Sequence, residues 1–154
     1  MAPRAITWEE LEQRLADIER HTVRIGVFAS GPGGDLVAGS DLTMIGLASI
    51  HELGLGGLPQ RSFIRAGIEH HADAIGAVQN KLVRKIFAGE LGGAVAAEVL
   101  GQYGVGRVRD YVFTHALDGA WANAPSTIAR KGSDRPLVDT GRLMASISYQ
   151  VVTR

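Results

Sequence analysis

Cysteine is absent from this chain of 154 residues, so we expect neither a disulfide framework nor a thiolate metal site. Aromatic residues make up only 6% of the sequence. No run of uncharged apolar residues approaches the length of about 18 that a membrane-spanning helix needs. The first residues lack the basic start and apolar run of a signal peptide. These absences favour a protein that folds around a hydrophobic core in a reducing compartment such as the cytosol.

The net charge is formally zero, which argues against a general DNA-binding surface, because such a surface needs an excess of basic side chains. The charges are nevertheless unevenly distributed. Residues 1–77 hold 6 basic and 10 acidic residues, and residues 78–154 hold 10 and 6. Opposite charge on the two halves would favour head-to-tail packing between identical subunits, although ordinary scatter of surface charge explains the split about as well.

Hydrophobic spacing predicts helices between two terminal strands. Thr7 and Glu10 have the spacing of a capping box, and the first helix is expected over about 8–20, with Trp8 on its buried stripe. Alternating apolar residues predict strands over 23–29 and 147–153. Further predictions are a helix over 42–52 capped by Asp41 and ended by Gly54, an extended piece over 61–65, and helices over 67–87 and 94–116.

Glycine is abundant, with 20 residues. The glycine-rich segments 30–41 and 54–59 are expected to be flexible loops. Gly101, Gly104 and Gly106 lie inside a predicted helix, where each costs about 1 kcal/mol relative to alanine. Three such residues indicate a kink or a close approach by another part of the chain.

Pairing of the first and last strands would close the chain on itself. The sequence therefore predicts an α+β fold in which a small antiparallel sheet is flanked by helices. We expect residues 1–154 to form a single domain, because this length suits one hydrophobic core.

Asp139-Thr140-Gly141 matches the triplet of retroviral-type aspartic proteases, in which two chains bring together two carboxylates that share one proton. Arg142 directly after it does not fit, because a guanidinium would keep both carboxylates ionised. The chain also lacks the many short strands of such proteases. We favour a helix cap by Asp139 or Thr140 over 141–146. An aspartic hydrolase that uses Asp139 in a dimer is the alternative from another class.

The histidines form no metal motif. His51-Glu52 lacks the second histidine of a zinc protease, and His70 and His71 point about 100° apart on a predicted helix. No serine lies in a nucleophile elbow, and no glycine segment matches a nucleotide-binding loop. We therefore expect no metal, no cofactor and no enzymatic activity.

Basic residues cluster in the second half of the chain, and such clusters are more often solvated faces than nucleic-acid sites. A nucleic-acid-binding module that uses this half is a third hypothesis, since its binding would depend strongly on salt. The clusters are Lys81, Arg84 and Lys85; Arg107 and Arg109; and Arg130 and Lys131.

Several segments, taken together and in this order, are similar to the neck and tail-completion proteins of long-tailed phages, including the Mu-like virion-morphogenesis type. The similarity runs from about residue 23 to 152 and is most specific in the last segment. The segments are 25–28 (IGVF), 51–54 (HELG), 58–65 (LPQRSFIR), 100–110 (LGQYGVGRVRD) and 124–151.

This resemblance implies a structural virion protein without enzymatic activity. It would join or complete the head–tail junction as a homo-oligomeric, typically sixfold, ring, after assembly in the cytoplasm of the host bacterium. Its partners would be copies of itself, the head-completion or connector protein, and the tail-terminator or tail-tube protein. DNA would pass through the lumen without sequence-specific binding, and no membrane would be involved. A tail-terminator or minor tail ring protein is the alternative within this class.

The resemblance does not identify contact residues, so we select them by size or charge within expected loops. Trp121 stands out because interface cores are enriched in tryptophan. We expect the acidic first half to face the lumen, because a basic wall would bind DNA. The loops over 30–41 and 54–59 would order against neighbouring rings. The selected contact residues are Phe63, Arg65, Trp121, Arg130, Lys131 and Arg135.

Overall fold

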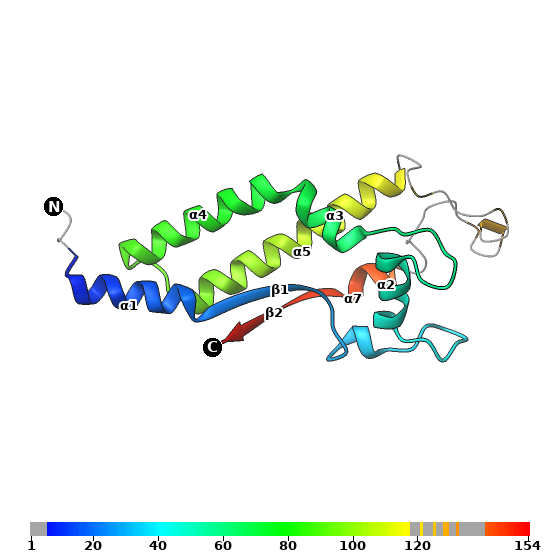
Figure 1. Ribbon diagram of the computed structural model, residues 1–154, viewed down its shortest axis with the longest axis horizontal. Coiled ribbons are helices and arrows are strands. Elements are labelled where there is room, and N and C mark those ends of the chain that lie inside the picture. The colour runs from blue at the N-terminus through cyan, green and yellow to red at the C-terminus, as the bar shows by residue number, and fades with distance from the viewer. Residues whose placement is uncertain (1–5, 118–120, 122–124, 126–127, 130–131, 133–140) are drawn as a thin grey trace.

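The computed structural model describes residues 6–117, 121, 125, 128, 129, 132 and 141–154 (Figure 1). Within them, helices and a two-stranded antiparallel sheet form the expected α+β fold. In chain order the elements are α1 (Trp8–Glu19), β1 (His21–Val27), the 3-10 helix η1 (Pro32–Gly34), α2 (Met44–Leu53), α3 (Phe63–His70), α4 (Ala72–Ala88), α5 (Gly93–Leu117), α7 (Arg142–Ser146) and β2 (Ile147–Thr153).

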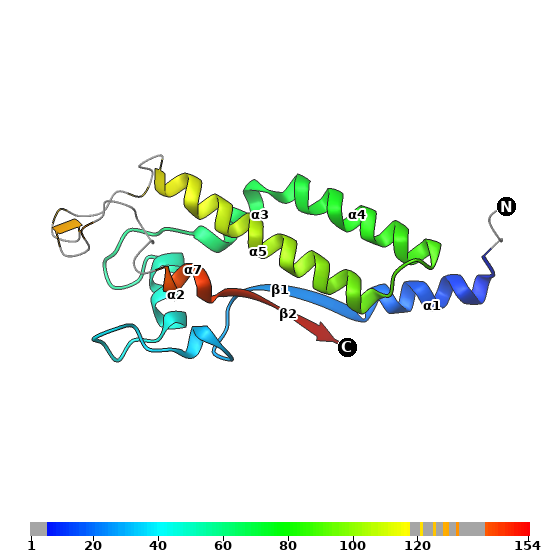
Figure 2. The same ribbon diagram turned by 180° about the vertical axis from the view of Figure 1, so that it is seen from behind.

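The sheet joins the two ends of the described chain, which confirms the predicted pairing of the first and last strands. β1 and β2 pair over their full lengths, with His21 opposite Thr153 and Val27 opposite Ile147. Helix α5 packs against both strands, and α3 and α4 pack against α5. Figures 1 and 2 show the resulting layers, with the sheet on one side of α5 and α3 and α4 on the other.

The main core lies where α5 crosses the sheet and meets α3. Val108, Val112, Phe63 and Ile147 are fully buried there. A second cluster joins α4 to the first half of α5, and Ile18 of α1 packs against it. Long-range packing around α5, rather than the narrow sheet alone, therefore holds the elements together.

Helix α1 confirms its predicted start but not its predicted burial. The Thr7 Oγ1 accepts from the Glu10 backbone N–H at 3.2 Å, and the Glu10 carboxylate accepts from the Thr7 N–H at 3.0 Å. Trp8, however, is 72% exposed, so its expected place in the buried stripe is wrong. The physical reason is that the first turn of α1 projects beyond the end of α4, where nothing in the described chain covers it (Figure 1).

Helix α2 begins two residues later than predicted. The Oγ1 of Thr43 accepts from the Gly46 N–H at 3.2 Å, so Thr43 caps the helix and the expected cap Asp41 lies too early. Gly54 ends the helix with φ = 69°, a left-handed conformation that glycine adopts without strain, as predicted.

The region between 61 and 88 differs most from prediction. Residues expected to be extended enter α3 at Phe63, and the single helix expected over 67–87 breaks at His71 (φ = −104°, ψ = 17°). The break separates α3, which crosses α5 closely at Gly67, from α4, which runs beside the first half of α5. A continuous helix could not follow both directions (Figure 2).

Of the two glycine-rich segments, 30–41 contains η1, and its Leu36 forms a β-bridge with Thr43 just beyond the segment. The predicted flexibility of both segments stays a prediction.

Gly141 takes the N-cap position of α7 with φ = 72° and no side-chain cap. The alternative caps Asp139 and Thr140 lie outside the described residues.

The glycines of α5 confirm the predicted close approach, and the approaching groups are side chains of the sheet. A Cβ at Gly101 would overlap the ring of Tyr149, and one at Gly104 would overlap the Cδ1 of Ile25. Gly106 faces open space. Two of the three glycines are therefore needed for the contact between α5 and the sheet.

We expect Gly101→Ala to lower the free energy of unfolding by about 1–2 kcal/mol, because displacing the Tyr149 ring costs roughly 1–3 kcal/mol and the gain in helix propensity is at most about 1 kcal/mol. Gly106→Ala is the matched control and should raise the free energy of unfolding by roughly 0.5–1 kcal/mol. Urea denaturation measures both, and equal effects at the two sites would contradict the packing described.

Candidate functional site

The junction between α2 and α3 is organised by one carboxylate. Glu52 Oε1 accepts from the Ser62 hydroxyl at 2.8 Å and from the Arg65 N–H at 3.1 Å, and Oε2 accepts from the Ile64 N–H at 2.9 Å. The last residues of α2 thus cap the free N–H groups of α3, where a negative charge also opposes the helix dipole favourably. Ser62, at the N-cap, makes no such bond itself.

The connection between these helices is held by two further bonds. The Arg61 N–H donates to the His51 carbonyl at 2.7 Å, and the Gln60 side-chain amide donates to the Glu52 carbonyl at 3.0 Å. The segments 51–54 and 58–65, which share in the phage-protein resemblance, are therefore one local structure.

Arg109 joins two other segments of the phage-protein resemblance, 100–110 and the last one. Its guanidinium donates from Nε to the Met144 carbonyl at 3.1 Å and from Nη2 to the carbonyls of Ala145 and Ile147 at 3.4 and 2.8 Å. These carbonyls lie at the end of α7 and the start of β2. A cation from α5 thus satisfies backbone acceptors where the chain changes from helix to strand.

The selected contact residues have different environments. Phe63 is fully buried in the core of its own chain, so its side chain offers no surface to a neighbour. Arg65 is exposed at the start of α3. Trp121 is half-buried and packs against the core. The other three, Arg130, Lys131 and Arg135, lie outside the described residues, as does Asp139.

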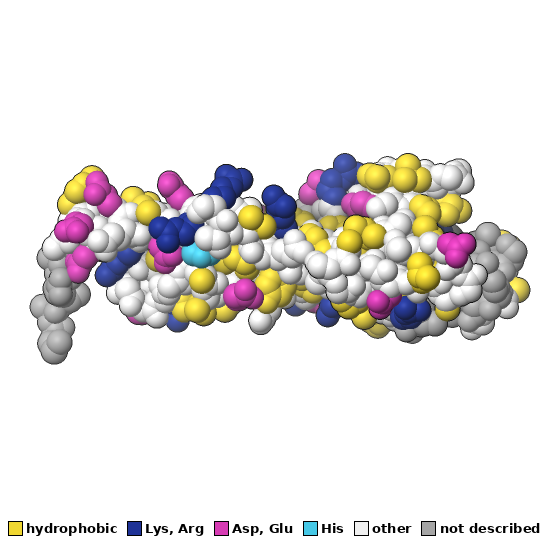
Figure 3. Space-filling view, turned by 90° about the horizontal axis from the view of Figure 1, so that it is seen from below, with side chains coloured by type: hydrophobic (Ala, Val, Ile, Leu, Met, Phe, Trp, Pro, Cys, Tyr) yellow, Lys and Arg dark blue, Asp and Glu magenta, His cyan; other side chains and the backbone are white. Residues whose placement is uncertain are grey.

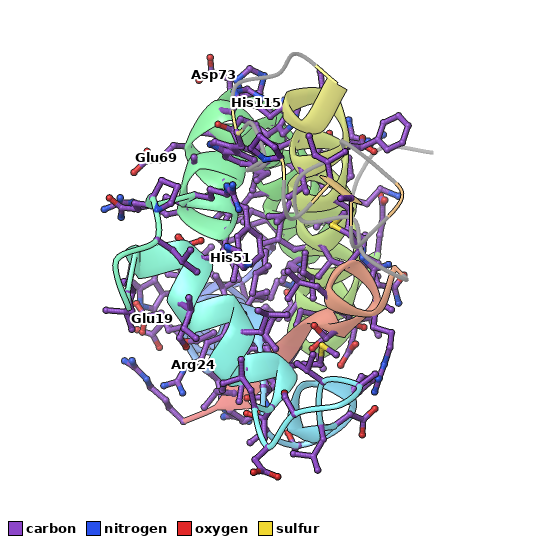
Figure 4. The ribbon with its side chains drawn as sticks, turned by 90° about the vertical axis from the view of Figure 1, so that its right-hand side faces the viewer. Glu19, Arg24, His51, Glu69, Asp73 and His115 are labelled. Atoms are coloured by element: carbon purple, nitrogen blue, oxygen red, sulfur yellow. The ribbon has the colours of Figure 1, made fainter. Side chains whose placement is uncertain are left out.

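A cluster of five rings surrounds the α3–α4 junction and the last turns of α5. Tyr111 stacks on His115 with centroids 4.0 Å apart, and Trp121 meets both rings at 5.8 and 5.5 Å. His70 lies 5.3 Å from Tyr111 and 4.8 Å from His71. Figure 4 shows His115 at this end of α5, beside α3. An open hollow of about 360 Å³ lies over the cluster.

Burial, the neighbouring His70 and the charge of Arg107 lower the pKa of His71, against an opposing effect of Asp110. Burial also raises the pKa of Tyr111.

In the described part of the chain, no group of three or more His, Cys, Asp or Glu side chains is arranged to hold a metal ion. The rings of Tyr111 and His115 form a packed surface against which Trp121 lies. Sequence reasoning missed the cluster because α3 and α5 meet only in the folded chain.

Large hydrophobic side chains are exposed around the end of α2. Leu53 is 61% exposed, and Leu55 and Leu58, in the following loop, are each 47% exposed. Leu36, near η1, is 54% exposed. Figure 3 shows hydrophobic side chains on the underside of this half of the molecule. Such surfaces are typical of protein contacts.

The basic residues Lys81, Arg84 and Lys85 lie on α4, largely on the side opposite its core residues Leu82 and Ile86. The two arginines of the next cluster do not form a basic face with them, since Arg107 pairs with Asp110 at 2.7 Å and Arg109 bonds to the backbone. Within the described residues, no helix has the length and apolar character needed to cross a membrane.

Comparisons of the chain with protein-family models, curated proteins and solved structures found no match. The resemblance to phage neck proteins therefore rests on the segments quoted above.

Replacing Glu52 with alanine should lower the free energy of unfolding by about 2–3 kcal/mol, because three hydrogen bonds to a charged acceptor are lost at a helix start. Glu52→Gln keeps one acceptor oxygen and should lose less. Glu69→Ala, at an exposed carboxylate that makes no hydrogen bond to any described residue, should stay within about 0.5 kcal/mol of the parent protein. Thermal or urea unfolding distinguishes these cases.

The lowered pKa of His71 predicts a pH dependence of stability. Near and below the ordinary value of 6.5 the unfolded chain binds the proton more readily than the folded chain. The free energy of unfolding should therefore fall as the pH drops through 6.5 and level off below the folded-state pKa. His71→Gln should reduce this slope in urea titrations between pH 5 and 8, and an unchanged slope would contradict the assignment.

Proposed function

We propose that this chain is a structural virion protein of a tailed phage or prophage that joins or completes the head–tail junction as a homo-oligomeric ring around the DNA channel. The observation that carries the proposal is that the described parts of the resembling segments pack together. Glu52 joins 51–54 to 58–65, and Arg109 joins 100–110 to the last segment. Ile25, in the first segment, packs against α5 at Gly104.

The distribution of exposed groups is consistent with contacts at both ends of the molecule. The molecule is elongated, with α1 at one end and the loops around η1 and between α2 and α3 at the other (Figure 1). Exposed Leu53, Leu55 and Leu58 lie at the loop end, and exposed Trp8 lies at the α1 end. Such an arrangement suits a subunit that contacts neighbours within a ring at some surfaces and adjacent rings at others.

The proposal predicts that virions made without this protein fail at the junction. Electron microscopy of lysates from a deletion in the encoding phage or prophage should show filled heads beside unattached tails, and the intact protein supplied in trans should restore whole particles. Tails of abnormal length would favour the tail-terminator alternative. Normal, infectious virions would refute a joining role.

A further inference from the structure

Helix α1 carries an exposed stripe, defined here as Trp8, Glu12, Leu15 and Glu19. These residues are four, three and four positions apart, which places them on one helix face. Trp8 is 72% and Leu15 42% exposed, and both glutamates are exposed. The Trp8 indole N–H donates to Glu12 Oε1 at 2.7 Å, which holds the ring along this face.

A neighbouring side of α1 fixes the helix to its own chain. Arg14 donates from Nη1 to the Phe87 carbonyl at the end of α4, and Asp17 accepts from the Gly93 N–H at 2.6 Å. Ile18 packs against the second core cluster. The stripe is therefore presented by a helix that is held in place, and Figure 3 shows hydrophobic and acidic side chains together on this projecting end.

The outer face of α4 has the opposite character. A shallow hollow of about 670 Å³ lies along it. Small residues at either end, Ala77 and Ala88, leave room beside the cations Lys81, Arg84 and Lys85, none of which forms an ion pair with any described residue. Asn80 and Glu90 complete the lining.

The two surfaces complement each other in length and charge. The stripe carries apolar and acidic groups over about three turns, and the α4 face carries three cations between two terminal alanines over the same length. An indole fits beside alanine and stacks well on a guanidinium, and carboxylates pair with the cations. A single chain cannot make this contact, because its own α1 is fixed at the carboxyl end of α4 by Arg14.

We propose that the α1 stripe of one copy docks on the outer face of α4 in the next copy. Two different surfaces then meet, so the contact is head-to-tail and can repeat around a closed ring. The inference rests on the proposed ring and supplies its contact between subunits. The basic face alone would also suit nucleic acid, but the matching acidic helix on the same chain favours a second copy.

Charge reversal tests this contact. One variant carries Glu12→Lys and Glu19→Lys, and the other carries Lys81→Glu and Arg84→Glu. Each alone brings like charges together and should weaken self-association about tenfold or more in mass photometry and sedimentation. An equimolar mixture should recover association, because the reversed α1 stripe of one variant then meets the reversed α4 face of the other, and the unreversed α1 stripe of the second meets the unreversed α4 face of the first. Asp41→Lys with Glu69→Lys, exposed carboxylates off the stripe, is the matched control and should associate like the parent protein.

The outcomes separate this contact from the proposed function. Circular dichroism checks that each variant is folded. Trp8→Ala, which removes the indole and changes no charge, should also weaken association. Parent-like oligomers from both reversed variants, a mixture that fails to recover, or a parent chain that stays monomeric would overturn the contact. So would duplex DNA binding that is lost in the α4 variant while oligomers persist. Complementary association together with normal virions in the deletion would support the contact and refute the neck role.

Discussion

The contact between α5 and the strand pair is the interaction on which the rest of the fold depends. β1 and β2 are separated by more than a hundred residues, so their pairing carries a substantial loop-closure entropy, and two strands alone are only marginally stable. Gly101 and Gly104 let Tyr149 and Ile25 approach the helix, and Tyr149 also donates to Glu98 of α5 at 2.5 Å. Packing on α5 thus supplies the stability that the two-stranded sheet lacks by itself.

The remaining elements are positioned by polar contacts that end or begin helices. Arg109 fixes the turn from α7 to β2, Glu52 starts α3 at the place where it meets α5, and Asp17 meets the first N–H of α5. Each contact joins a charged side chain to backbone groups that a helix terminus leaves unsatisfied, and each links residues well separated in sequence. The charged residues in these positions therefore satisfy backbone groups at the junctions where one element ends and the next begins.

The sequence predicts the features that depend on local chemistry. Thr7 and Glu10, Gly54 and the alternation in both strands identify their elements, and the α5 glycines indicate a close contact. The errors arise where tertiary packing decides. A helical pattern cannot show that α1 projects and leaves Trp8 uncovered, or that the chain turns at His71 to follow two parts of α5. The Glu52 cap was missed because its donors are 10–13 residues away. Phe63 was selected as a contact residue for its size, but it is fully buried in the core. Size alone does not distinguish the two cases, because a large apolar residue beside a loop can equally well belong to the core.

The character of the α1 and α4 surfaces determines how cooperative the proposed assembly would be. Contacts between exposed ions are screened by salt, and one helix face buries little area, so a single such contact is weak and reversible. Closure of a ring adds a further contact without further loss of translational freedom, which makes the closed ring much more stable than any open intermediate. In the proposed ring, open chains of subunits would therefore dissociate readily, whereas the closed ring would persist. An acidic helix against a basic helix, with Trp8 and Leu15 as its apolar groups, is suited to an assembly that forms cooperatively.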